Sequence, residues 1–158
     1  MDSVGTVMTV SDVLSADDIL LDVDATSRRG VFEAVGELFA SRYGLNRPQV
    51  SNALYAREQL GSTGLGHGVA LPHARLSGVE GAVAAYVRTR MPIPFDAPDG
   101  KPVTDMIVLI VPRHANEMHL QLLADVANLF ASKEFREQLR ACDDAAQVKQ
   151  LIQAHSRR

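Results

Sequence analysis

A run of six apolar residues, Met106 to Val111, restricts the possible folds of this chain more than any other segment. Successive side chains of a strand point to opposite faces of its sheet, so a strand made only of apolar residues must be covered on both faces. Helices packed on each side of the sheet provide that cover in α/β proteins. The run is also much too short to cross a bilayer. We therefore predict a central strand between two layers of helices, and no insertion into a membrane.

Around this strand, the spacing of apolar residues alternates between helical and strand periods, which favours a mixed α/β domain. One helix is expected to begin after an N-cap at Thr26 or Ser27 and to end at Gly44, and others begin at Asn46 and Asn116. In total we expect about five helices and four or five strands. The remaining expected elements are a short helix at 9–14, strands at 19–23, 69–71 and 82–88, and helices at 133–140 and 144–155.

Length and composition narrow the function further. The 158 residues suffice for one ordinary domain, and the formal charge of −3 argues against a nucleic-acid-binding protein, which would usually be basic. The single cysteine, Cys142, excludes an internal disulfide and fits a reducing cytoplasm. The N-terminus lacks the basic and apolar regions of a signal peptide. Arg88 and Arg90 share one face of an expected strand and predict a solvated strand edge.

The segment Gly61 to Gly68 holds four glycines in eight residues, so we expect no regular element there. Such a loop bares backbone N–H groups that suit an anion, but it lacks the Lys and the following helix of a Walker A loop. Pro72 is expected to end the pairing of the strand at 69–71. His73 would then lie at the carboxyl end of a strand, where open α/β sheets bind ligands. A glycine-rich turn followed by an exposed His73 explains the pattern equally well.

Two other side chains are candidates for the same site. His119 occupies the third position of the helix capped by Asn116, and a helix N-terminus favours a phosphate. Its alternative role is that of a core histidine bonded to a carbonyl. Arg57 lies on the apolar face of its helix, at the end that leads into the glycine-rich loop. It could face the ligand of that loop, or simply the negative end of its own helix dipole.

Two histidines, an arginine and a glycine-rich loop without a carboxylate cluster favour covalent handling of an anion, with His as the nucleophile. No cofactor is expected. Three alternatives stay open: a metal site, a nucleotide-binding module and a pure interaction domain. A metal site is disfavoured because five residues including Pro72 separate His67 from His73 and no Cys or acidic residue stands at ligand spacing around these two. The four histidines that could cluster are His67, His73, His114 and His119.

The run from Arg57 to Arg75, which contains the loop and His73, resembles the active-site signature of phosphotransferase-system enzyme IIA proteins of the mannitol/fructose superfamily. The stretches 95–103 and 117–124 resemble its nitrogen-regulatory branch. The resemblance extends over about residues 9–154 and implies a single domain at 1–158. It also implies a single five-stranded mixed sheet flanked by helices on both faces.

The resemblance implies that His73 is phosphorylated through Nε2. The donor would be a small HPr-like histidine phosphocarrier, itself charged by an enzyme I that uses phosphoenolpyruvate. His119 would be the second active-site histidine, and Arg57 the cation beside the phosphoryl group. Ser62 and Thr63 match loop positions that bind phosphate oxygens.

The branch also implies the partners. Nitrogen-type members are cytoplasmic regulators whose phosphorylation state is read by partners in potassium transport and in nitrogen or carbon regulation. The alternative is a sugar-specific IIA that passes phosphate to a IIB component. Three positions depart from the family pattern: Ala74 stands where many members have Gly, Met118 replaces a frequent acidic residue, and His67 occupies a position that can be acidic in sugar-specific members.

Overall fold

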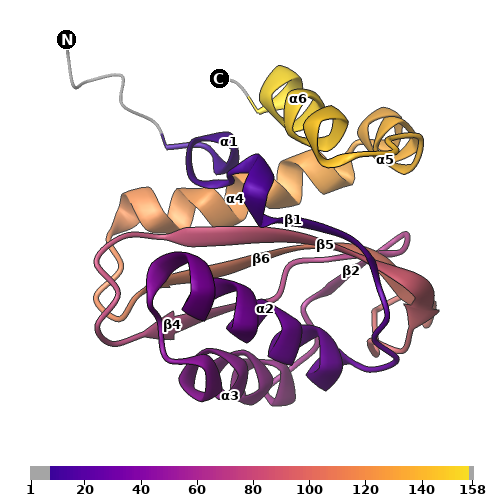
Figure 1. Ribbon diagram of the computed structural model, residues 1–158. Helices are drawn as coiled ribbons and strands as arrows, with labels where there is room; N and C mark the ends of the chain where they lie inside the picture. The colour runs from indigo at the N-terminus through magenta and orange to yellow at the C-terminus, as the bar shows by residue number, and fades with distance from the viewer. Residues whose placement is uncertain (1–7, 157–158) are drawn as a thin grey trace, which may run out of the picture.

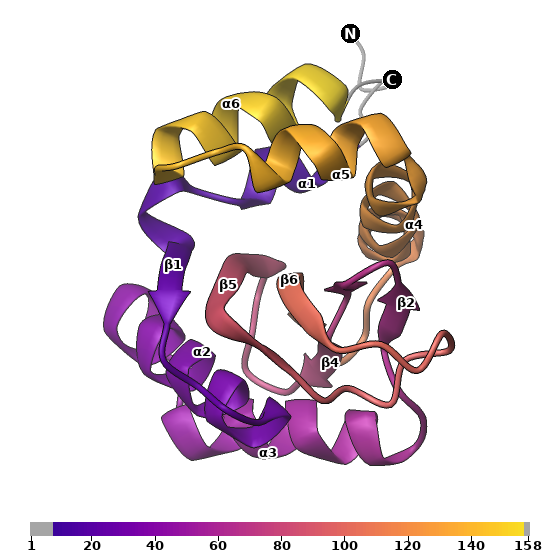
Figure 2. The same cartoon turned by 90° about the vertical axis from the view of Figure 1, so that its right-hand side faces the viewer.

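The computed structural model describes residues 8–156, and the expectation about a signal peptide concerns residues 1–7, outside this range. One sheet lies between two layers of helices (Figures 1 and 2). Among residues 8–156, no helix is long and apolar enough to cross a membrane. The elements are α1 (Val10–Val13), a 3-10 turn (Ala16–Asp18), β1 (Ile19–Val23), α2 (Arg28–Tyr43), α3 (Arg47–Gln59), β2 (Gly64–Gly66), β3 (Val69–Ala70), β4 (His73–Leu76), β5 (Val83–Ile93), β6 (Val103–Pro112), α4 (Glu117–Ala131), α5 (Lys133–Arg140) and α6 (Ala145–His155).

The sheet has the strand order β1-β5-β6-β3-β2, and β4 also pairs with β6. It is mixed: β5 runs antiparallel to β6, whereas β1 is parallel to β5 and both β3 and β4 are parallel to β6. The predicted α/β class and the mixed sheet are confirmed. The sheet has six strands rather than five, and its short strands β2 and β4 lie at positions where the spacing of apolar residues predicted none.

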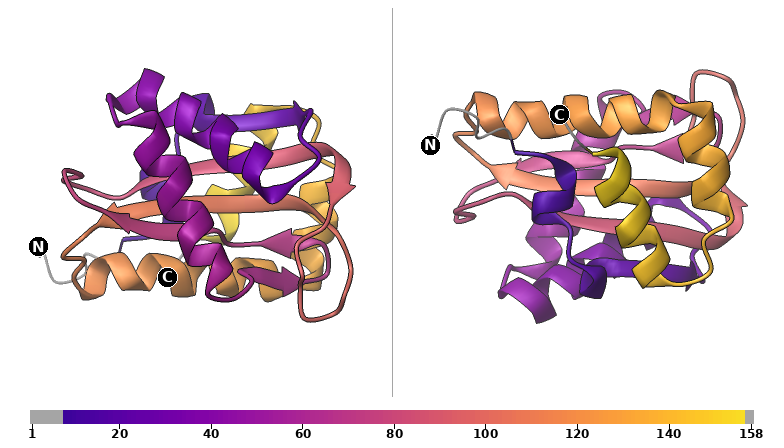
Figure 3. Two further views of the ribbon diagram at one scale, coloured as in Figure 1. Left: turned by 90° about the horizontal axis from the view of Figure 1, so that it is seen from below. Right: turned by 90° about the horizontal axis from the view of Figure 1, so that it is seen from above.

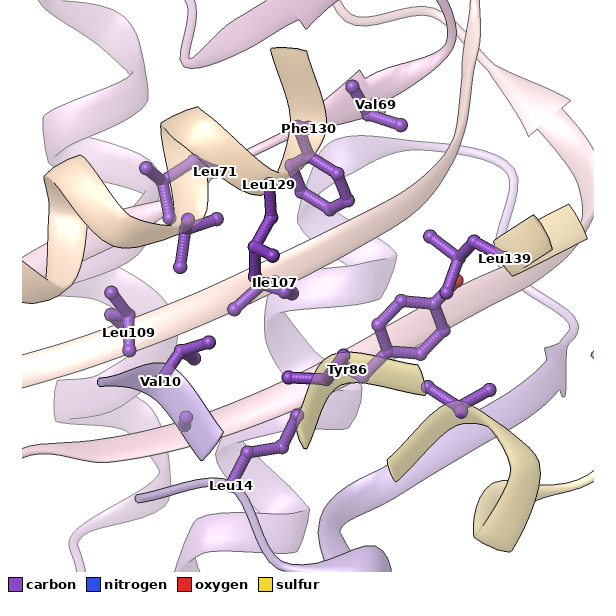
Figure 4. Packing of buried hydrophobic residues seen from close by; sticks show 14 of the residues in the cluster. Val10, Leu14, Val69, Leu71, Tyr86, Ile107, Leu109, Leu129, Phe130 and Leu139 are labelled. Carbon is purple, nitrogen blue, oxygen red and sulfur yellow. The ribbon is translucent and has the colours of Figure 1, made fainter. Parts of the chain in front are cut away.

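The prediction for the apolar run is confirmed, because β6 is central and covered on both faces. Ile107 and Leu109 face one core, which α1, α4, α5 and α6 cover (Figure 4). Met106 and Val108 face the second core, beneath α2 and α3. Figure 3 shows these two groups of helices crossing opposite faces of the sheet.

The glycine-rich segment forms a tight hairpin, so the prediction of no regular element there is wrong. β2 pairs antiparallel with β3, and the two residues between them, His67 and Gly68, have φ angles of 58° and 80°. Two successive residues with positive φ are the mark of a type I′ hairpin turn, whose twist matches that of the flanking strands. The glycines therefore build a hairpin and its turn, and position 67 accepts His in a left-handed conformation.

Pro72 follows the end of the β3 ladder, which stops at Ala70 as predicted, but it does not end the contact of the chain with β6. Its carbonyl oxygen accepts a hydrogen bond from the backbone N–H of Leu109 at 2.9 Å, and His73 then pairs with Leu109 in β4. A proline lacks only its N–H, so its carbonyl can still bind the neighbouring strand. His73 thus follows the carboxyl end of β3 by three residues, as predicted, and it also begins a further strand, β4.

The expectation of a solvated edge at Arg88 is also wrong, because β5 lies inside the sheet between β1 and β6. The Arg88 guanidinium is partly buried, pairs with Asp105 at 2.9 Å, and donates to the carbonyl oxygens of Leu139 and Cys142. Arg90, by contrast, is exposed as expected. Arg88 thus ties the C-terminal helices to the sheet.

Candidate functional site

Three of the predicted site residues line one pocket of about 610 Å³, formed by α3, β4, the end of β6 and the start of α4. Arg57 comes from the last turn of α3, His73 begins β4, and His119 lies in the first turn of α4. Arg57 and His119, which are far apart in the sequence, therefore line the same pocket. The structure brings together the two histidines and the arginine, as the sequence analysis expected.

The His73 ring is oriented by the backbone just before it. Its Nδ1 lies 2.8 Å from the carbonyl oxygen of Leu71. A carbonyl oxygen only accepts, so Nδ1 carries the proton and Nε2 keeps its lone pair. Burial lowers the pKa of His73 below 6.5; the Leu71 bond and Glu58 oppose this shift, and the positive charge of Arg57 adds to it. His73 is therefore a neutral imidazole at neutral pH, with Nε2 unprotonated.

The His119 ring carries its proton on the opposite nitrogen. The Asn116 side chain caps α4 by accepting from the His119 N–H at 3.0 Å, and the Asn116 N–H donates to Nδ1 of His119 at 3.3 Å. This reciprocal arrangement is a capping box with His in the place of Glu. Because Nδ1 accepts, the neutral ring has its proton on Nε2 and offers a donor there.

Arg57 is fixed at the mouth of the glycine-rich hairpin. Its guanidinium donates to the carbonyl oxygen of Gly61 at 2.9 Å, just past the end of its own helix. This bond uses one of the five N–H donors of the guanidinium and leaves the others available to an anion. Arg57 was expected either to face the ligand of the loop or to face the negative end of its helix dipole, and the structure is compatible with both roles. Its guanidinium binds a carbonyl just beyond the helix end, and the residue also lines the pocket.

Ser62 and Thr63 do not line this pocket. The Ser62 hydroxyl donates to the carbonyl oxygen of Phe95 at 2.6 Å and accepts from the Gly64 N–H at 3.0 Å. The Thr63 hydroxyl is buried and donates to Glu58 at 2.6 Å. Both hydroxyls thus hold the loop in place, and their role as phosphate ligands stays a prediction.

Glu58 is a residue of this region that the sequence analysis missed. Its carboxylate is 4% exposed and accepts from the Thr63 N–H at 2.9 Å, the Thr63 hydroxyl, and the Arg28 guanidinium at 3.3 Å. The pattern carried a signal, because Glu58 follows the buried Val50 and Leu54 at intervals of four on α3. A carboxylate on an apolar stripe requires buried partners.

The histidines do not gather into a metal site in the part of the chain that the structure describes. His67 lies in the hairpin turn and lines a different cleft from His73 and His119. Between residues 8 and 156, no group of three or more His, Cys, Asp or Glu is arranged to hold a metal ion. The site is therefore built from imidazole, guanidinium and backbone groups.

The rim of the pocket is apolar and exposed. Leu60 is 86% exposed and Leu120 is 45% exposed, and both line the pocket that contains His73. Large apolar side chains exposed together beside polar groups mark surfaces that bind other proteins. One pocket is thus lined by two imidazoles and a guanidinium, together with the exposed apolar side chains of Leu60 and Leu120.

Comparisons with known proteins agree with this geometry. The family model described as "Phosphoenolpyruvate-dependent sugar phosphotransferase system, EIIA 2" matches residues 12–155. A nitrogen regulatory protein of Pseudomonas aeruginosa is 35% identical over 144 residues, covering 90% of this chain and 94% of the relative.

Two solved structures give the same picture. Nitrogen regulatory protein IIA-Ntr from Neisseria meningitidis superposes with a TM-score of 0.85 at 42% identity, covering 90% of this chain and 98% of that one. IIA mannitol from Escherichia coli has a TM-score of 0.72 at 20% identity, covering 87% and 97% of the two chains, and shares the fold. With a family match over 12–155 and relatives of this identity, the chain belongs to the EIIA 2 family of the phosphoenolpyruvate-dependent phosphotransferase system, and it resembles the nitrogen-type members most among these examples.

Proposed function

We propose that this chain is a cytoplasmic phosphoryl carrier of the nitrogen-type system, that it accepts a phosphoryl group on Nε2 of His73, and that its phosphorylation state regulates partner proteins. The observation that carries the proposal is the bond between Nδ1 of His73 and the Leu71 carbonyl oxygen, at 2.8 Å. It leaves Nε2 as the free nucleophilic nitrogen of a neutral ring in the pocket. Family membership supplies the reaction class, because family members are phosphotransferase components.

In the proposed step, the Nε2 lone pair attacks the phosphorus of a phosphohistidine on the donor protein. The new P–N bond forms while the donor's P–N bond breaks, and the electron pair of that bond returns to the donor imidazole. A donor ring protonated on its other nitrogen leaves as neutral imidazole. His73 keeps the proton on Nδ1, so its ring becomes cationic as it takes up the phosphoryl group.

Backbone and charge then stabilise the product. The cationic ring strengthens the bond from Nδ1–H to the Leu71 carbonyl oxygen, because charge-assisted hydrogen bonds are stronger than neutral ones. The phosphoryl group adds roughly −2 charge to the pocket. The Arg57 guanidinium and the Nε2–H of His119 are the groups that could meet this charge. The cationic ring also keeps the phosphoryl group transferable, since neutral imidazole is a good leaving group.

The donor is proposed to be a small histidine phosphocarrier that docks on the apolar rim. Leu60 and Leu120 give this surface exposed apolar area around a recessed nucleophile. The downstream targets are proposed to be regulatory proteins, in potassium transport and in nitrogen or carbon control. A sugar-specific role, with transfer to a IIB component, is the less supported alternative, because identity is 42% to the nitrogen-type structure and 20% to the mannitol-type one.

The test is a phosphotransfer assay with purified enzyme I, histidine phosphocarrier and phosphoenolpyruvate. The chain should gain one acid-labile phosphoryl group, and His73→Ala should gain none. His67→Ala is the matched control, because it removes a histidine from a different cleft and should be labelled normally. Labelling that survives in His73→Ala would refute the site. Efficient onward transfer to a mannitol- or fructose-type IIB would favour the sugar-specific alternative.

A further inference from the structure

A second cleft, of about 470 Å³, lies between α5, the turn of the β2–β3 hairpin and the loop that joins β5 to β6. Helix α5 contributes one continuous face to it, because its lining residues are spaced by three, four and seven positions. The cleft is lined by His67, Gly68, Lys101, Pro102, Lys133, Arg136, Glu137 and Arg140. It thus collects four cationic side chains and one carboxylate in a chain whose formal charge is −3.

The protein balances this positive charge only in part. The Asp99 carboxylate accepts from the backbone N–H groups of His67 and Lys101, and these bonds, together with the charge of Lys101, lower the pKa of Asp99. Within residues 8–156, none of Lys101, Lys133, Arg136 and Arg140 forms an ion pair with a carboxylate, although Glu137 lines the same cleft. Like charges held close together repel one another and favour binding of an anion. The cleft therefore carries a local excess of positive charge that would attract an anion.

Arg136 gives the cleft a built floor. Its side chain is 8% exposed, and one guanidinium nitrogen donates to the Phe130 carbonyl oxygen at 2.7 Å. In the described part of the chain its other guanidinium nitrogens donate to no protein atom. A buried guanidinium with unused donors is costly unless a ligand or water satisfies it. This arginine is thus fixed from behind and has donors left for the cleft it lines.

On the side of the cleft formed by the β2–β3 turn, the turn backbone fixes the position of Arg140. Arg140 donates to the carbonyl oxygen of His67, which fixes the guanidinium against the hairpin turn. A Cβ added at Gly68 would lie 3.1 Å from the Arg140 guanidinium, so a side chain at this position would press on that cation. Gly68 therefore serves the turn and also leaves room for the cationic wall of the cleft.

We propose that this cleft binds a small molecule through a diphosphate group. Two arginine forks and two lysine point charges suit two adjacent phosphates, which take bidentate and single contacts together. The volume is within the range of small-molecule sites. Among the described residues, the lining of the cleft contains no Phe, Tyr or Trp, and His67 is its one aromatic ring, so we expect recognition to rest chiefly on the diphosphate.

The cleft is separate from the pocket of His73. His119 lies at the start of α4, and the cleft begins with Lys133, just beyond the end of α4 (Figure 1). A helix rises 1.5 Å per residue, so the two sites are on the order of 20 Å apart. Binding of a diphosphate at this cleft does not require phosphoryl transfer at His73, so the two can be tested separately.

The test is calorimetric titration with inorganic pyrophosphate, combined with amide NMR shifts to locate the binding site. The wild type should bind, with shifts at Gly68, Lys101 and Arg140. Lys101→Gln/Lys133→Gln should weaken binding at least about tenfold, because charge-assisted contacts are lost. Arg47→Gln/Arg90→Gln removes the same charge from exposed sites elsewhere and should bind normally. ADP should bind within about tenfold of pyrophosphate, since the diphosphate is the recognised group.

His73→Ala separates this site from the phosphoryl pocket and should bind pyrophosphate like the wild type. Four results would overturn the proposal: no pyrophosphate binding at millimolar concentration, shifts confined to the pocket of His73, equal loss in the Arg47/Arg90 double variant, or binding of ADP without binding of pyrophosphate. Failure of His73 to accept phosphate would leave this result unchanged.

Discussion

His73 and His119 line one pocket and carry their protons on opposite nitrogens. The Leu71 carbonyl oxygen holds the proton of His73 on Nδ1, and the Asn116 N–H directs that of His119 to Nε2. The neutral His73 ring therefore presents a lone pair on Nε2, and the neutral His119 ring presents an N–H there. The division of roles is set by backbone groups, so substitution of neighbouring side chains should leave it intact.

The pKa of His73 is the first prediction at this scale. It should titrate below 6.5, chiefly because of burial, and Arg57→Gln should raise this pKa by removing a nearby positive charge. Arg90→Gln, an exposed control far from the pocket, should leave it unchanged. The pKa of His73 in the wild type and in the two variants is measured from its imidazole NMR signals as a function of pH. A pKa at or above 6.5, or no rise in Arg57→Gln, would contradict the described electrostatics.

The same shift predicts a pH dependence of stability. The unfolded chain binds the proton of His73 more readily than the folded one, because the folded pKa is the lower of the two. The resulting stabilisation is complete above about pH 6.5 and is lost as the pH falls from there toward the folded pKa. His73→Gln should remove this part of the acid sensitivity in urea unfolding between pH 5 and 7. An unchanged pH dependence would contradict it.

Glu58 carries the third prediction for a single residue. Glu58→Gln replaces a carboxylate that accepts from Thr63 twice and pairs with Arg28. A buried pair broken on one side costs about 2–3 kcal/mol of unfolding free energy, since the remaining donors lose their acceptor. Urea unfolding measures this, and Gln59→Ala, at the exposed neighbouring position, is the control. Equal stability of the two variants would show that the carboxylate does not anchor the loop.

At the scale of elements, the β2–β3 hairpin sets the path from the glycine-rich segment to His73. Gly68 has φ of 80° in its turn, and a Cβ would also meet Arg140 at 3.1 Å. Gly68→Ala should therefore lower the unfolding free energy by about 1–2 kcal/mol. Gly81→Ala is the matched control, because nothing lies within 4 Å of the added Cβ there. Thermal or urea unfolding gives the unfolding free energy of both variants. Equal stability of Gly68→Ala and Gly81→Ala would contradict the predicted cost of a side chain at Gly68.

Local signals predicted most of the elements. Ser27 caps α2, Gly44 ends it at φ of 70°, and Asn46 and Asn116 cap α3 and α4 as expected. These signals act within a few residues, so the sequence displays them directly. The apolar run of β6 was equally visible, since double-sided burial needs only the composition of one strand.

The errors concern pairing between distant segments. The hairpin strand β2, the strand β4 that begins at His73 and the burial of Arg88 all depend on which segment lies alongside. The sequence of one strand does not reveal which segment packs beside it. Arg88, which binds carbonyl oxygens near the C-terminal helices, therefore cannot be told from an exposed arginine by its sequence pattern. The three pocket residues were already candidates from the glycine-rich loop, the cap of α4 and the apolar face of α3, and the resemblance added their roles. Glu58 lies on the same helix as Arg57 but was missed, because its signal is only its spacing of four from the buried Val50 and Leu54.

At the scale of the whole molecule, the phosphoryl group is proposed to act as a charge added to a rigid frame. His73 lies in a strand paired with the central β6, which both helical layers cover. Phosphorylation should therefore shift amide NMR signals around the pocket and leave those of α5 and α6 in place. A spectrum in which signals of α5 and α6 also move would show a global rearrangement instead of a local change of charge.

The most direct test is a long-range proton–nitrogen NMR spectrum of the imidazole rings in the phosphorylated protein. We predict coupling to phosphorus at Nε2 of His73, with Nδ1 of the same ring protonated and bonded to the Leu71 carbonyl oxygen. Phosphorus on Nδ1 of His73, on His119, or on any other side chain would contradict the proposed chemistry.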